Sequence, residues 1–138
     1  KVGGILCEFE PRGGPPPAVV VGVGVNLRGG AGDFPPEIRS RAGSLESEGG
    51  RAPGPQEALE RLLERLGSWC KIMLSEGFSP VRRRWLELCD NLGEEVRLPR
   101  EGGEIIGRVA GIDERGRLLL TPPEGGEIAV EAGEVVEG

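Results

Sequence analysis

"AVVVGVGVNL", residues 18–27, is an apolar run that is interrupted by two glycines and closed by an asparagine. The turn-forming "PRGGPPP" separates it from a second apolar stretch, "KVGGILCEFE", at residues 1–10. Glycine and proline clusters between β-branched runs are typical of connections between strands. We therefore expect residues 1–27 to form two antiparallel strands of a mixed sheet, joined by a long proline-rich tip. The second strand lacks polar alternation, which predicts burial on both of its faces.

Two helices are expected after a glycine-rich loop at 28–36 and a short helical turn near 36–41. Between about Gln56 and Glu76, apolar side chains recur at intervals of three and four residues, which is typical of one helix face. These side chains are Leu59, Leu62, Leu63, Leu66, Trp69, Cys70 and Met73. A second helix is expected from Ser79, as N-cap, to about Leu92, with Pro80 in its first turn. We expect both apolar faces to cover the hairpin sheet and not the C-terminal part of the chain after residue 93.

From Glu94 onwards the pattern changes to short apolar runs separated by turns. The expected strands are "EVRL" (95–98), "IIGRVAGI" (105–112), "RLLLT" (117–121), "IAV" (128–130) and "VV" (135–136). Five short strands at nearly even spacing predict a small SH3-like β-barrel. The expected fold class is therefore α+β, a partial mixed sheet with covering helices in residues 1–93 followed by a barrel in residues 94–138.

Composition excludes several classes of function. The formal net charge is −6, and "RRRW" at 82–85 is the one marked basic run, which reads as the solvated face of a helix. We expect no nucleic-acid partner. The three cysteines form no C-x-x-C pair and histidine is absent, which argues against a zinc site or a Ser-His pair. The longest apolar run, at 18–25, is too short to span a bilayer, and no leader is visible, so we expect a cytoplasmic protein with no membrane partner.

The Gly-x-Gly of "GVGVN" has two interpretations. A dinucleotide fingerprint needs a third glycine and a helix directly after the strand, and neither is present. Glycine in a strand permits close approach of a ligand or of another backbone, and Asn26 offers the donor and acceptor that an adenine edge requires. The alternative is a strand packed tightly on a helix and ended by a turn-favouring asparagine. Lys1 is likewise either a surface residue or a point charge for a carboxylate or phosphate.

The motif "K-x-x-G-I-L-x-E" at 1–8, followed by "V-V-G-x-G-x-N" at 20–26, resembles the biotin protein ligases. The resemblance extends through the whole chain. It includes "PPEI" (35–38), "AGSLESEGG" (42–50), "LLERL" (62–66), "RRRWLELC" (82–89), "GRVAGIDERGRLLLT" (107–121) and "GGEI" (125–128). The match implies the C-terminal half of a ligase catalytic domain plus the family's SH3-like C-terminal domain. The family's "GRGRxGRxW" loop would lie upstream of Lys1.

The resemblance implies ATP-dependent activation of biotin to biotinoyl-5′-AMP and its transfer to a lysine of a biotin carrier domain, such as that of acetyl-CoA carboxylase. By the same resemblance, Lys1 matches the catalytic lysine. Lys1, Leu6, Gly22 and Gly24 match the biotin site, and Asn26 matches the adenine contact. Mg²⁺ would accompany ATP, held mainly by phosphates and water.

Two departures limit the expected activity. Without the upstream loop, the 138 residues alone are expected to be inactive and to need an N-terminal ligase half as partner. Glu131 stands about where some relatives carry a basic residue, which argues against a direct ATP contact by the barrel. The alternatives are a noncatalytic module that docks a carrier domain or a partner ligase chain, and an α+β domain without a ligand.

Overall fold

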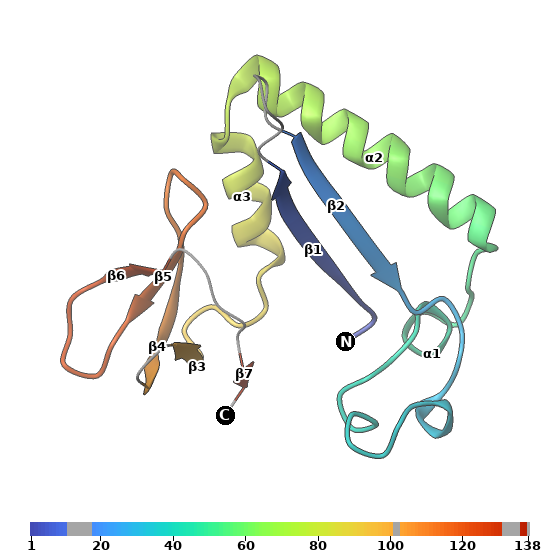
Figure 1. Cartoon of the computed structure of the whole chain (residues 1–138), viewed down its shortest axis with the longest axis horizontal. Helices are drawn as coiled ribbons and strands as arrows, with labels where there is room; N and C mark the ends of the chain where they lie inside the picture. Colours follow the sequence, from blue (N-terminus) through green and yellow to red (C-terminus); the bar gives the residue numbers. More distant parts are fainter. Residues whose placement is uncertain (11–17, 101–102, 131–135, 138) are drawn as a thin grey trace. The chain divides into compact units, whose positions relative to one another are not determined.

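The computed structural model describes residues 1–10, 18–100, 103–130 and 136–137 (Figure 1). It divides into two compact units, Lys1–Leu63 and Glu64–Gly138. The elements are β1 (Gly3–Glu10), β2 (Ala18–Val25), the 3₁₀-helix η1 (Ala31–Asp33), α1 (Leu45–Gly49), α2 (Pro55–Glu76), α3 (Ser79–Leu88), β3 (Glu95–Arg100), β4 (Gly103–Ile112), β5 (Leu118–Thr121), β6 (Ile128–Val130) and β7 (Val136–Glu137). The expected combination of helices with antiparallel strands is confirmed.

Strands β1 and β2 form an antiparallel pair whose register runs from Gly3↔Val25 to Glu10↔Ala18. The predicted pairing is therefore confirmed, while the predicted tip at 11–17 lies outside the described residues. No further described strand pairs with this sheet, so the expected mixed sheet is not seen in the described residues. The predicted burial of β2 is wrong, because all of its residues after Ala18 are exposed. In the described part of the chain nothing covers these apolar side chains.

The register sorts the hairpin side chains onto two different faces, because directly opposed residues point to the same side of a sheet. One face carries the glycines Gly4, Gly22 and Gly24 together with Leu6, Glu8 and Val20. The other face is wholly apolar apart from the glycine at its end. It consists of Gly3, Ile5, Cys7, Phe9, Val19, Val21, Val23 and Val25. We call these the glycine face and the apolar face of the hairpin.

The second unit contains a five-stranded antiparallel sheet in the order β6-β5-β4-β3-β7. All five strands expected downstream of Glu94 are present. Their core is a cluster of fully buried side chains, namely Val96, Leu98, Val109 and Leu120. Burying a side chain of this size contributes about 1.5–3 kcal/mol, so this cluster is the main source of stability in the unit. No pairing of β6 with β7 is seen among the described residues, so closure into an SH3-like barrel stays a prediction.

Helix α2 spans Pro55–Glu76, as its periodicity predicts. Helix α3 is shorter than expected: Phe78 is its N-cap, Ser79 is its first residue, and it ends at Leu88. It stops there because Cys89 adopts an extended conformation, with φ −73° and ψ 109°. In the described residues, no helix is both long enough and apolar enough to cross a membrane.

Helix α3 packs against β4 within its own unit, so the expectation that it avoids the second sheet is wrong, while its cover of the hairpin sheet stays a prediction. Arg82 Nε donates a hydrogen bond of 2.6 Å to Ile112 O, and Leu86 lies against Gly111. The half-buried Arg82 also corrects the view of "RRR" as a purely solvated face. Helix α2 keeps most of its apolar side chains exposed, including Leu59, Leu63, Leu66 and Met73.

Candidate functional site

The Lys1 side chain lies beside Gly4, at one end of the glycine face of the hairpin. A Cβ built on Gly4 would sit 3.7 Å from Lys1 Cε and 3.8 Å from Lys1 Nζ. Gly4 opposes Gly24, and Leu6 opposes Gly22 in the strand register. The structure thus brings four of the residues expected at the site, Lys1, Leu6, Gly22 and Gly24, onto one face.

This face is open enough to receive a flat ligand. A Cβ on Gly24 would meet no atom within 4 Å, and one on Gly22 would meet only Leu6 O at 3.7 Å. Because glycines carry no side chain, a ring can lie directly against the backbone here. Leu6 is 66% exposed and stands beside this surface as an apolar contact.

Asn26 follows β2 and is half-buried. Its backbone N–H donates to Val2 O at 2.7 Å, and its Nδ2 donates to Gly43 O at 3.0 Å. The second bond holds one amide hydrogen and so fixes the plane of the carboxamide. The other amide hydrogen and Oδ1 together form a donor and acceptor pair, which is the pattern that an adenine edge complements.

Gly43 joins Lys1 to Asn26. Its N–H donates to Lys1 O at 3.0 Å, while its carbonyl accepts from the Asn26 side chain. The Lys1 backbone nitrogen also donates to Arg41 O. Two residues 25 positions apart in the sequence are therefore held by one short segment, which places them at the same end of the hairpin (Figure 1).

Gly43 and its neighbour Ser44 were not among the residues expected at the site, and no helix was expected at residues 42–50. The structure forms helix α1 there, with Ser44 as N-cap and Gly50 closing the helix at φ 74°. A signal was present in the sequence. A serine followed by acidic residues within one turn, here Glu46 and Glu48, is typical of a helix start.

Polar groups elsewhere in the described residues do not form a metal site. Among the described residues, no group of three or more cysteine, aspartate or glutamate side chains could hold a metal ion. Cys7 and Cys70 are exposed, and the Cys89 thiol donates to Asn91 Oδ1 at 3.0 Å. Glu131, which stands about where some relatives are expected to carry a basic residue, lies outside the described residues.

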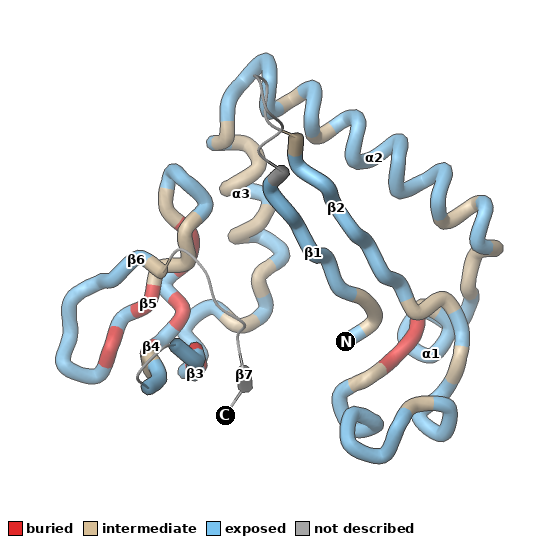
Figure 2. Tube along the Cα trace, viewed as in Figure 1, coloured by how far each residue is buried: buried red, intermediate tan, exposed pale blue. Residues whose placement is uncertain are grey.

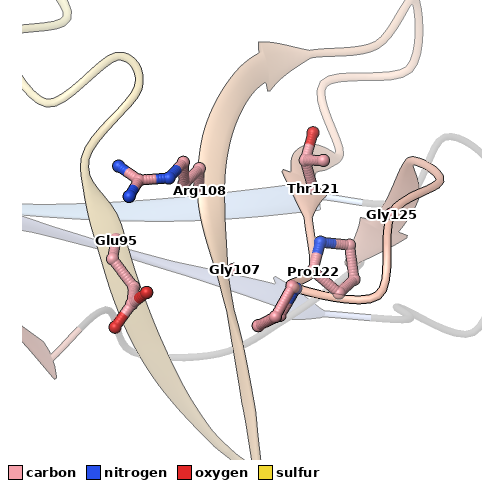
Figure 3. A pocket seen from close by; sticks show the side chains of 7 residues that line it. Glu95, Gly107, Arg108, Thr121, Pro122 and Gly125 are labelled. Carbon is pink, nitrogen blue, oxygen red and sulfur yellow. The ribbon is translucent and has the colours of Figure 1, made fainter.

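A pocket of about 360 Å³ lies on the second sheet, and no residue expected at the site lines it (Figure 3). Its polar side chains form one row across three strands, because Glu95 opposes Arg108 and Arg108 opposes Thr121. Arg108 donates to Gly93 O at 2.9 Å. The lining residues are Glu95, Gly107, Arg108, Thr121, Pro122, Pro123 and Gly125.

Comparison with known proteins identifies the second sheet. Residues 92–137, which contain all of β3 to β7, match the family of the biotin protein ligase C terminal domain. A crystal structure of biotin protein ligase from Aquifex aeolicus superposes with a TM-score of 0.79 and 29% identity, covering 98% of this chain. The resemblance to the biotin protein ligases is thereby confirmed.

Relatives in sequence agree with this identification. The biotin–[acetyl-CoA-carboxylase] ligase of Paracoccus denitrificans is 36% identical over 140 residues, which cover all of this chain and 58% of that ligase. The bifunctional ligase/repressor BirA of Bacillus subtilis is 28% identical over 91% of this chain and 38% of its own length. The chain thus spans less than two thirds of the ligases that it resembles.

The Aquifex aeolicus ligase has also been solved in complex with biotin and ATP. That structure superposes with a TM-score of 0.77 and 28% identity, over 98% of this chain and 54% of the ligase. Biotin and ATP are therefore ligands of a protein that shares the fold of this chain.

Proposed function

We propose that this chain supplies the C-terminal part of a biotin–protein ligase active site, with biotin and ATP as its substrates. The observation that carries the proposal is the register of β1 and β2, which gathers Gly4, Gly22 and Gly24 on one face, with the Lys1 side chain beside Gly4. The similarity to biotin protein ligases supports biotin as the ligand of this face.

The first proposed step is attack by a carboxylate oxygen of biotin on the α-phosphorus of ATP. A new P–O bond forms, the bond to the leaving pyrophosphate breaks, and biotinoyl-5′-AMP results. Because the step brings two anions together, a fixed cation between them stabilises the transition state. We assign that role to the Lys1 ammonium, which also binds biotin together with Leu6, Gly22 and Gly24.

The proposed nucleotide contact is Asn26, whose carboxamide is held in one plane by Gly43 O. Mg²⁺ would enter with ATP, bound mainly by phosphate oxygens and water, because the described residues do not gather a set of metal-binding side chains. This chain would therefore orient the nucleotide through its base and leave the metal to the phosphates.

In the second proposed step, a lysine amine of a biotin carrier domain attacks the acyl carbon of biotinoyl-5′-AMP. An amide bond forms and AMP leaves. We assign residues 94–138 as the C-terminal domain, which would face the carrier or the closing nucleotide site.

A specific observation also favours the alternative of a noncatalytic docking module. The family match covers only the second sheet, and that sheet carries the pocket of Figure 3.

Equilibrium binding distinguishes the two functions. The chain would be joined to the N-terminal half of the Paracoccus denitrificans ligase and titrated with biotin and with a nonhydrolysable ATP analogue. We expect Lys1→Ala to weaken biotin binding, and Asn26→Ala to weaken nucleotide binding, each by about tenfold, equivalent to ~1.4 kcal/mol.

The chain contains its own matched controls, since Lys71 is its only other lysine and Asn91 its only other asparagine. Lys71→Ala and Asn91→Ala should leave both affinities unchanged. Binding of a carrier domain without any binding of biotin or nucleotide would instead establish the docking module.

A further inference from the structure

Burial in the Lys1–Leu63 unit is concentrated outside its sheet. Among the described residues of this unit, Gly43 and Ser44 are the two that are buried (Figure 2). Ser44 has 0% exposure, whereas the strands of the hairpin are exposed. The best-packed point of the unit is therefore the segment that holds Lys1 and Asn26.

Ser44 makes hydrogen bonds with both its hydroxyl and its backbone. Its Oγ donates to Gly29 O at 2.6 Å and accepts from Ser47 N at 3.1 Å. Its N–H donates to Ser47 Oγ at 2.9 Å, which completes a reciprocal capping arrangement at the start of α1. A buried hydroxyl with both capacities satisfied has one orientation, so the start of α1 is fixed relative to Gly29.

The start of α1 in turn holds the end of β2. The first N–H groups of a helix have no partner within the helix. Here Leu45 N donates to Asn26 O at 2.9 Å, and Glu46 N donates to Leu27 O at 3.1 Å. Asn26 is thus bound by the segment at two points, its backbone carbonyl by Leu45 and its carboxamide by Gly43.

We infer that Ser44 is a positioning residue for the nucleotide site and acts through Gly43 and α1 on the Asn26 carboxamide. Loss of its hydroxyl would leave Gly29 O and Ser47 N without these partners and free the start of α1 to shift. A misplacement of about 1 Å at a reacting centre can cost about 100-fold in rate. The functional consequence rests on the proposed function, whereas the structural link from Ser44 to Asn26 does not.

The link can be measured directly in the 138-residue chain by NMR. The chain has three side-chain carboxamides, Asn26, Gln56 and Asn91, so the amide NH₂ signals can be assigned by Asn26→Asp, Gln56→Glu and Asn91→Asp. We expect one Asn26 amide proton to exchange slowly with solvent. Ser44→Ala should accelerate that exchange by about tenfold and leave the Asn91 signals unchanged.

Three further variants serve as controls for this measurement or as a substitute for Ser44→Ala. Ser44→Thr retains the hydroxyl and should retain the slow exchange, and Ser68→Ala, an exposed serine of α2, should change none of the signals. If Ser44→Ala unfolds the chain, Ser47→Ala removes the exposed half of the cap and should accelerate Asn26 exchange to a smaller extent. Fast exchange of both Asn26 side-chain amide protons in the unmodified chain would overturn the inference. So would slow exchange that persists in both Ser44→Ala and Ser47→Ala.

A second measurement tests the consequence in the ligase reconstituted with an N-terminal half. Ser44→Ala should raise KM for ATP by about tenfold with little change in KM for biotin, and it should add nothing in an Asn26→Ala background. Independent, additive effects of the two substitutions would contradict positioning through Asn26. Absence of adenylation in the unmodified complex would reject the proposed function, while the exchange measurement would still decide the link between Ser44 and Asn26.

Discussion

Asp113 organises the turn between β4 and β5. Its Oδ1 accepts from Arg115 N at 2.8 Å and Arg117 N at 2.9 Å, and its Oδ2 accepts from Arg117 Nε at 2.7 Å. Burial raises the pKa of the Asp113 carboxyl. The hydrogen bonds and charge of Arg117, with the Arg115 N–H, outweigh that effect and lower the pKa below its ordinary value.

The lowered pKa predicts a pH-dependent contribution to stability. A carboxyl whose folded pKa is depressed stabilises the fold above its unfolded pKa of about 3.9, and this contribution is lost as pH falls through the folded value. We expect Asp113→Asn to lower the free energy of unfolding at neutral pH and to differ less from the unmodified chain as pH falls through the lowered folded pKa of Asp113. Urea denaturation across this range is the measurement. Glu114→Gln serves as control, and an equal deficit for Asp113→Asn at every pH would contradict the account.

Two glycines predict opposite effects of the same substitution. A Cβ on Gly107 would lie 3.1 Å from Leu120 Cβ and 3.2 Å from Thr121 O, whereas one on Gly67 in α2 would meet nothing within 4 Å. Gly107→Ala should therefore destabilise the sheet by about 1–3 kcal/mol through overpacking. Gly67→Ala should stabilise by about 0.5–1 kcal/mol through helix propensity. Chemical denaturation of both variants measures the change in the free energy of unfolding. Equal changes of the same sign in the two variants would contradict the predicted packing.

Helix α3 is attached to β4 by one charged hydrogen bond and by apolar contacts. Because Arg82 donates to Ile112 O at 2.6 Å, Arg82→Ala should cost about 1.5–3 kcal/mol, as for other hydrogen bonds from charged groups. The neighbouring Arg83 is exposed, so Arg83→Ala should stay within about 0.5 kcal/mol. Thermal and urea unfolding of the two variants would measure the difference, and indistinguishable stabilities would show that α3 is not held in this way.

Periodicity predicted the helices and strands well, because each depends mainly on its own residues. The five strands after Glu94 and the helix at Pro55–Glu76 appear where the sequence placed them. Long-range packing was not predictable in the same way. The sequence shows that α3 has an apolar side, but not that Arg82 and Leu86 meet β4, because that choice depends on Gly111 leaving room for Leu86.

The candidate site was predictable only in part. The spacing of Gly22, Gly24 and Asn26 left a ligand site and a tightly packed strand as alternatives, and the structure then places Leu6 on the same face as these glycines and Lys1 beside Gly4. The contacts of the segment around Ser44 were not predicted, because they join groups 15–42 positions apart in the sequence, such as Ser44 Oγ with Gly29 O and Gly43 N with Lys1 O. No local pattern of side chains encodes such bonds.

For the molecule as a whole, the apolar face of the hairpin predicts self-association. Ile5, Phe9, Val19 and Val21 are all exposed on this face, and β1 and β2 pair with no other described strand. Exposed sheets of this kind pair with further chains. Sedimentation velocity should show mass increasing with concentration, and Val21→Glu should reduce it. Leu74→Glu in α2 is the control, since Leu74 is exposed but lies outside this face. A concentration-independent monomer would contradict the prediction.

The proposed function concerns the whole molecule and is tested most directly by formation of biotinoyl-5′-AMP from biotin and ATP. Positioning contributes about 7–11 kcal/mol to lowering a two-substrate barrier, and the family's biotin and phosphate loop is not among these 138 residues. We therefore expect no detectable biotinoyl-5′-AMP or pyrophosphate from the chain alone. With a compatible N-terminal ligase half, in trans or fused, adenylation should appear, should be lost in Lys1→Ala and should persist in Lys71→Ala. Adenylation that survives Lys1→Ala, or the absence of adenylation with every N-terminal half, would contradict the account.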